Sequence, residues 1–253
     1  MTNQGTFTKK ELEALAQLYA SGKIGKYDIP LELARAIHEF MVKRVSVGYG
    51  EAIADPLNPL YSKTKLLNNN LARFVSYKLI NISNDMSIAR AVLSGDNLAA
   101  KSIGVTTRYL NDWALTEYAT ATKLAAGARR WDEITADTAT FPLLQYLAVV
   151  DDNSRDDHAA LNGVIRPAND GFWDTNFPPN GYNCRCDVAQ LRSGEVTPMR
   201  KIATPTINPV FAHNPGKSSQ IFNRKHPYFG NRQRVLNNRQ KAVAEVVAKK
   251  LLI

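Results

Sequence analysis

Residues 145–163 read QYLAVVDDNSRDDHAALNG, and this stretch marks a change in the character of the chain. The first six residues are mostly apolar and rich in β-formers, which predicts a buried strand. The polar segment that follows, Asp151 to Gly163, holds several carboxylates, an arginine and a histidine. Because functional groups often lie on the loop that leaves a strand, we expect the site of this protein here.

Upstream of this stretch the chain has the apolar spacing of helices. Thr8 and Glu11 form a capping-box pattern, and Pro30 suits the first turn of a second helix. Apolar residues three and four apart predict helices over residues 8–22, 30–48, 66–82, 86–93 and 106–131. The first half of the chain is therefore expected to be helical.

Downstream, Pro, Gly and Asn interrupt any long element, and residues 188–191 are a candidate partner strand. Residues 198–215 are expected to be extended, and residues 232–252 to form a basic helix. The predicted fold class is α+β: a mainly helical N-terminal half, a small loop-rich α+β module with a short antiparallel sheet, and a basic C-terminal helix. The predicted domains are a helical docking region (1–131), the module (132–230) and the basic helix (231–253).

The composition is that of a globular protein, with 44% hydrophobic and 22% charged residues. No apolar run reaches the roughly 18 residues that a membrane span needs, so no membrane partner is expected. The N-terminal residues lack the apolar core of a secretory signal, which favours the cytoplasm as the site of synthesis and assembly. Cys184 and Cys186 are too close in sequence for an unstrained disulfide, so both are expected to be reduced.

Positive charge is concentrated at the end of the chain. Residues 200–253 carry 11 Lys or Arg against 1 acid, whereas residues 132–199 carry 4 against 11. A block of this kind suits phosphate backbones, and DNA binding without sequence specificity is one prediction for it. A purely solubilising role is the alternative. The candidate DNA contacts are Arg232, Arg234, Arg239, Lys241, Lys249 and Lys250.

Three side chains between Asp151 and Cys186 could hold a metal ion. His158, Cys184 and Cys186 offer three zinc ligands, with Asp151, Asp152 or water as a fourth. Their spacing does not match the usual paired zinc knuckles. The sequence therefore leaves zinc as one candidate cofactor and favours a site without a cofactor.

In that favoured interpretation the same residues are structural. The ring of His158 would bridge the Asp151 loop to the backbone of Asn183–Cys186, and Arg155 or Arg185 would pair with nearby acids. A third interpretation makes His158 and the carboxylates the centre of a metal-dependent nuclease or toxin-like effector. The chain lacks His-Glu-x-x-His, phosphate-loop and nucleophile-elbow motifs, so we predict that it is not an enzyme.

The order of these residues resembles that of the Mu F-like family of phage minor head proteins. The matching positions are Asp151, Arg155, His158, Gly163, Phe172-Trp173-Asp174, Pro178, Pro179, Asn183, Cys184, Arg185 and Cys186. The segments Trp113 to Trp131, Asn214-Pro215-Gly216-Lys217 and Lys225-His226-Pro227-Tyr228 are similar to members from Bacteroidetes phages and prophages. The resemblance covers about residues 106–230.

This chain departs from the family pattern at one point. Many members have a histidine shortly before the NCRC sequence, where this chain has Gly181-Tyr182. The departure removes a candidate fourth metal ligand unless His213 or His226 folds back to the site. It therefore favours a structural role for His158.

The resemblance implies a head morphogenesis protein of the virion that binds and does not turn over a substrate. Its expected partners are the portal, with the scaffold or major capsid protein and non-specific DNA as further candidates. Its expected location is the capsid interior or portal vertex, reached by assembly in the bacterial cytoplasm.

Overall fold

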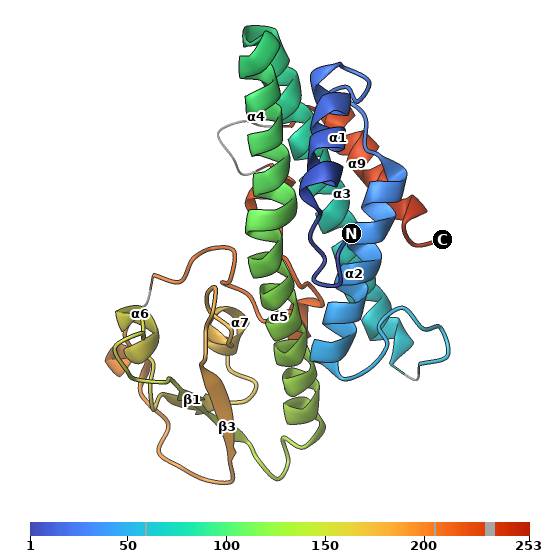
Figure 1. The fold of residues 1–253 in the computed structure, drawn as a ribbon. Helices are drawn as coiled ribbons and strands as arrows, with labels where there is room; N and C mark the ends of the chain where they lie inside the picture. Colours follow the sequence, from blue (N-terminus) through green and yellow to red (C-terminus); the bar gives the residue numbers. More distant parts are fainter. Residues whose placement is uncertain (59, 205, 231–235) are drawn as a thin grey trace. The chain divides into compact units, whose positions relative to one another are not determined.

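The computed structural model describes residues 1–58, 60–204, 206–230 and 236–253. It confirms the predicted α+β class, with long helices in the first half and a small antiparallel sheet (Figure 1). The chain divides into a helical unit (Met1–Arg44, Ile53–Ala119 and Lys225–Ile253) and a sheet unit (Val45–Ala52 and Thr120–Arg224). Among the described residues, none of the helices has the length and apolar character needed to cross a membrane.

The first half of the chain contains α1 (Lys9–Ala20), α2 (Leu31–Tyr49), α3 (Tyr61–Val92), α4 (Gly95–Thr107), the π-helical turn η1 (Arg108–Asp112) and α5 (Trp113–Ala136). The second half contains β1 (Leu143–Leu147), α6 (Asp156–Ala159), β2 (Ile165–Pro167), α7 (Trp173–Asn176), β3 (Asp187–Leu191), η2 (Met199–Lys201), α8 (Pro215–Ser218), η3 (Pro227–Phe229) and α9 (Asn238–Lys250).

Capping boxes start the first and last helices. At α1, Glu11 N–H donates to the Thr8 hydroxyl, and the Glu11 carboxylate accepts from Thr8 N–H, as the sequence predicts. At α9, Asn237 and Gln240 form the same reciprocal pair. This cap begins α9 at Asn238, so the helix is shorter than the predicted 232–252, and residues 231–235 lie outside the described residues.

The prediction of two helices over residues 66–82 and 86–93 is wrong, because α3 is continuous from Tyr61 to Val92. Polar side chains at the expected break bond to the preceding turn of the helix itself. Asn81 Nδ2 donates to Tyr77 O at 2.7 Å, and Ser83 Oγ donates to Leu79 O at 3.2 Å. These back-bonds satisfy the polar groups without ending the helix.

The predicted helix over residues 106–131 is interrupted at its start by η1, and α4 was not predicted. A π turn holds an extra residue and changes where side chains point. Here the Tyr109 hydroxyl donates to Asp85 at 2.9 Å, and Asn111 makes two 2.8 Å bonds to the backbone of Phe7. The residues that make these three tertiary hydrogen bonds, Tyr109 and Asn111, both lie in the π turn, where the helical period changes.

An ion pair is buried inside the helical unit. Lys78 Nζ lies 2.6 Å from Glu117 Oε2, and the two side chains are 1% and 7% exposed. The Tyr228 hydroxyl donates to the other carboxylate oxygen of Glu117. Every charge in this group therefore has a partner, as burial requires.

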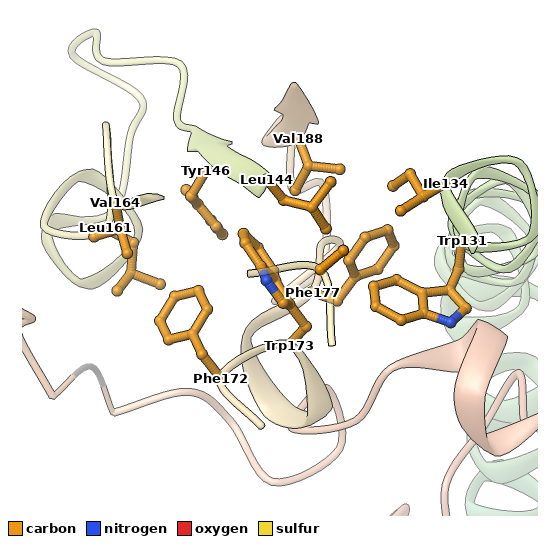
Figure 2. Packing of buried hydrophobic residues seen from close by; sticks show 11 residues of the cluster. Trp131, Ile134, Leu144, Tyr146, Leu161, Val164, Phe172, Trp173, Phe177 and Val188 are labelled. Atoms are coloured by element: carbon orange, nitrogen blue, oxygen red, sulfur yellow. The ribbon is translucent and has the colours of Figure 1, made fainter. Parts of the chain in front are cut away.

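The sheet unit is built on three antiparallel strands in the order β2-β1-β3. The predicted strand over residues 145–150 lies at Leu143–Leu147, and its predicted partner at residues 188–191 is β3. β2, which ends in a proline, was not predicted. Figure 2 shows the apolar core of this unit, which contains Trp131, Ile134, Leu144, Tyr146, Leu161, Val164, Ala168, Phe172, Trp173, Phe177 and Val188.

Candidate functional site

The site is built on the loop that leaves β1. Asn153 N–H donates to Asp151 Oδ1 at 3.0 Å, which tightens the turn at the start of the loop. The chain then enters the single turn of α6, which carries His158, 5% exposed. Gly163 ends the segment with φ of 79° and donates its N–H to Tyr146 O. That left-handed conformation explains the glycine at this motif position.

The NCRC segment brings both cysteines to His158. Asn183 has φ of 58°, a left-handed conformation that asparagine tolerates better than most residues. Beyond it, the Sγ atoms of Cys184 and Cys186 each lie 3.7 Å from His158 Nδ1. All three candidate ligand atoms lie within 4.8 Å of one another. The structure thus brings together the three residues that the sequence suggests as metal ligands.

The two cysteines are free and do not form a disulfide. A hydrogen bond from the Cys186 thiol lowers the pKa of Cys184 to about 4; burial opposes this shift, and a hydrogen bond with His158 adds to it. The pKa of Cys186 is raised because Cys184 accepts its proton and because it is buried. The hydrogen bond to Cys184 also raises the pKa of His158. Without a metal ion, these contacts therefore favour the thiolate form of Cys184.

Arg185, which lies between the two cysteines in sequence, binds the loop that follows β1. Its two terminal nitrogens lie 2.7 Å from the two carboxylate oxygens of Asp151, and this contact holds the pKa of Asp151 well below its usual range. Arg155 donates to the backbone carbonyl oxygen of Tyr182 at 2.8 Å. The predicted bridge from His158 to the NCRC backbone takes another form, because Nδ1 faces the two sulfur atoms.

The segment before NCRC is packed closely around the cluster. Pro178 and Pro179 are joined by a cis peptide bond and are buried. A Cβ built on Gly181 would lie 3.1 Å from Arg155 Nη1 and 3.5 Å from His158 Cε1. Position 181 therefore faces the histidine, although this chain has no side chain there.

Two further side chains contact the cluster and were not predicted from the sequence. The Tyr146 hydroxyl donates to Asn180 Oδ1 at 2.8 Å, and Lys123 Nζ donates to Cys184 O at 3.0 Å. Alternation along β1 could have placed Tyr146 on the same buried face as Leu144. Nothing in the local sequence indicates the role of Lys123, which comes from α5.

The other two candidate histidines are engaged elsewhere. His213 Nε2 lies 3.0 Å from Gln220 O and its Nδ1 lies 3.3 Å from Asn223 Nδ2. His226 Nδ1 accepts from Tyr228 N–H. Neither belongs to the three-residue cluster identified among the described residues.

Two cavities border the NCRC segment. One holds about 20 Å³ and is lined by Val149, Asn153, Ser154, Arg155, His158, Asn183, Cys184, Arg185 and Cys186. The other is an open groove of about 430 Å³ lined by residues of α5, by residues 177–179 and by residues 184–187. The first is the size of one water molecule.

The Asn214–Lys217 motif is explained by its packing on Trp131. The Asn214 side chain accepts from Gly216 N–H and Lys217 N–H, which caps α8. A Cβ on Gly216 would lie 2.3 Å from Trp131 Cβ, so only glycine fits there. Lys217 Nζ lies 4.9 Å from the centre of the Trp131 ring.

The candidate DNA contacts fall on two regions. Arg232 and Arg234 lie outside the described residues. On α9, Arg239, Lys249 and Lys250 are exposed and Lys241 is half-buried. The Arg239 guanidinium also lies over the ring of Tyr27, at 4.1 Å from its centre.

Comparison with known proteins identifies the region that contains the cluster. Residues 84–189 match the family model described as Phage Mu protein F like protein. The match starts earlier than the predicted 106–230 and excludes the motifs at residues 214–217 and 225–228. No solved structure matches the chain.

Two curated relatives are similar to parts of the chain. One is the "Putative capsid assembly protein F" of Escherichia phage Mu, 38% identical over 81 residues, which are 32% of this chain and 18% of that protein. Another is the "Mu-like prophage FluMu F protein" of Haemophilus influenzae, 46% identical over 50 residues, which are 20% of this chain and 12% of that protein. The matches thus span less than a fifth of either relative's length, and the Bacteroidetes subgroup stays a prediction. Residues 84–189 of the chain are thus similar to the Mu F-like family of phage proteins.

Proposed function

We propose that this protein is a non-enzymatic minor component of a phage head that associates with the portal during procapsid assembly. The observation that carries the proposal is the family match over residues 84–189, together with the capsid-assembly name of the phage Mu relative. The scaffold or major capsid protein and packaged DNA are further proposed partners. The proposed location is the capsid interior or portal vertex.

The helical unit is the proposed docking region. A hollow of about 180 Å³ lies between α1 and α4 and is lined by Glu13, Ala16, Gln17, Ala20, Ala99, Ser102 and Ile103. The side chains there are mostly small, and Ile103 is 39% exposed. A helix or loop of a partner could bury this apolar side chain and the small side chains around it.

Co-purification from assembling procapsids tests the proposal. The protein should be recovered with portal-containing particles, and its absence from them would contradict the proposed association with the portal. Ala99→Arg places a long charged side chain in the hollow and should reduce recovery. Ala100→Arg is the matched control, because Ala100 is also exposed on α4 but does not line the hollow.

A nuclease assay on the purified full-length chain tests the non-enzymatic part of the proposal. We expect no metal-dependent cleavage of DNA. Cleavage by the wild type that disappears in His158→Ala would contradict the proposal and support the nuclease alternative.

A further inference from the structure

We propose that His158, Cys184 and Cys186 bind one zinc ion that fixes the loop after β1 to the NCRC segment. The inference does not rest on the proposed role in head assembly, because it concerns only the three side chains and their surroundings. It goes beyond the favoured interpretation from the sequence, in which the same residues are a clamp without a metal.

The two sulfur–nitrogen distances in the cluster fit a tetrahedral zinc site. Zn–S bonds of about 2.3 Å and Zn–N bonds of about 2.0–2.1 Å, at the tetrahedral angle, place sulfur and nitrogen roughly 3.6 Å apart. In this structure both Sγ atoms lie 3.7 Å from His158 Nδ1. The ring nitrogen therefore stands at the same, zinc-compatible distance from each cysteine.

In a hydrogen-bonded clamp, the Cys186 thiol bonds to Cys184, and His158 Nδ1 needs to lie near Cys184 alone. A single imidazole nitrogen carries either one proton or one lone pair, so it serves one sulfur well and not two. Nδ1 instead faces both sulfur atoms equally. A metal ion between the three atoms accounts for the convergence, because each ligand then directs its lone pair to a common centre.

The surroundings also suit a buried metal ion. His158 and Cys184 are each 5% exposed, and Cys186 is half-buried. Tyr146 is held by Asn180 beside the cysteines, and Lys123 fixes the backbone of Cys184. Such outer contacts orient metal ligands and are a regular part of metal sites. Two thiolates and a neutral imidazole balance the charge of Zn²⁺, and this soft ligand set favours zinc over magnesium or calcium.

The fourth ligand is assigned to water. The two carboxylate oxygens of Asp151 are taken by Arg185, and no fourth side chain joins the cluster among the described residues. The adjoining cavity of about 20 Å³ is large enough for one water molecule and too small for a nucleotide. The zinc ion therefore has a structural role in this assignment.

Metal analysis of the full-length protein is the first test. Protein purified without chelators should contain zinc in an equimolar amount, and Co²⁺ loaded in its place should give the thiolate charge-transfer absorption of a tetrahedral site. Cys184→Ser and Cys186→Ser should each weaken that absorption, and His158→Gln should lower zinc content. His213→Gln is the matched control, because His213 is buried and bonds to Gln220 and Asn223.

A second test uses variants and conditions that keep the cluster intact. Removing zinc with a chelator should lower the melting temperature of the wild type, and added Zn²⁺ should restore it. Gly181→His should tighten Co²⁺ binding, because a side chain at that position starts 3.5 Å from His158 Cε1 and Arg155 can move aside. Folded wild-type protein that contains no zinc and gives only the spectrum of hydrated Co²⁺ would overturn the proposal.

Discussion

Lys78 Nζ lies 2.6 Å from Glu117 Oε2 in the interior of the helical unit, where neither charge reaches solvent. Replacing Glu117 with Gln would leave a buried ammonium ion without its counter-ion and only one oxygen to accept from both Lys78 and the Tyr228 hydroxyl. We expect this change to destabilise the protein by about 3–5 kcal/mol. Urea denaturation of the full chain measures it.

The control for this experiment is the exposed pair of Lys9 and Glu13, at 3.8 Å with side chains 90% and 41% exposed. Glu13→Gln should change the unfolding free energy by less than about 1 kcal/mol. The double variant Lys78→Met, Glu117→Leu should be more stable than Glu117→Gln alone, because it leaves no unpaired charge. Equal costs for the buried and the exposed pair would show that Lys78 reaches water.

Gly216 has no room for a side chain against Trp131. Gly216→Ala would place a methyl group 2.3 Å from Trp131 Cβ, so either α8 or the indole must shift. We expect a cost of about 1–3 kcal/mol. Gly104→Ala is the matched control: nothing lies within 4 Å of its Cβ position on α4, and it should stabilise by about 0.4–1 kcal/mol. Thermal unfolding that ranks the two variants in the reverse order would contradict this packing.

The Asp151–Arg185 pair should make the loop after β1 sensitive to acid. Since Arg185 lowers the pKa of Asp151 in the folded protein, the pair stabilises the loop above the ordinary aspartate value of about 4. That contribution is lost as the pH falls further, through the folded pKa. An NMR titration of the Asn153 amide, which donates to Asp151, measures the midpoint.

Arg185→Gln should move that midpoint up toward the ordinary aspartate range. The control is Asp152→Asn, which removes the neighbouring exposed carboxylate and should leave the midpoint of Asp151 nearly unchanged. A midpoint of Asp151 that is the same with and without Arg185 would mean that the two side chains are apart in solution.

The exposed lysines at the end of α9 should contribute to DNA binding. Lys249→Gln with Lys250→Gln should weaken binding to any sequence and reduce the slope of log affinity against log salt by about 0.9 per lost phosphate contact. Lys9→Gln with Lys10→Gln removes the same charge from α1 and should have a smaller effect. Filter binding or fluorescence anisotropy at several salt concentrations distinguishes them, and equal effects would leave α9 a solubilising surface.

Short sequence patterns predicted those helices and strands whose positions depend on residues close together in the sequence. The Thr8 capping box placed the start of α1, and the apolar run before Asp151 placed β1 within a few residues. The π turn could not be predicted in this way, because Asn111 and Tyr109 reach partners far away in sequence, at Phe7 and Asp85. β2 has only three residues and ends in Pro167, so its pairing with β1 carries no clear sequence signal.

The candidate site also combines features that the sequence indicates with features that it could not show. Residue types alone suggested His158, Cys184 and Cys186 as one group, and the structure brings them together. The sequence could not show that one ring nitrogen faces both sulfur atoms, because this depends on the path of residues 178–183. Nor could it show that Gly181 lies against His158, since a missing side chain leaves no pattern to detect.

The NCRC segment holds one loop through residues of alternating kind: Cys184 and Cys186 reach His158, and Arg185 between them reaches Asp151. Exchanging a single residue would remove one attachment and leave the others. Inserting or deleting one residue would put the arginine where a cysteine belongs and lose all of them together. The spacing of these residues should therefore resist insertions and deletions during evolution more strongly than any one of their identities resists substitution.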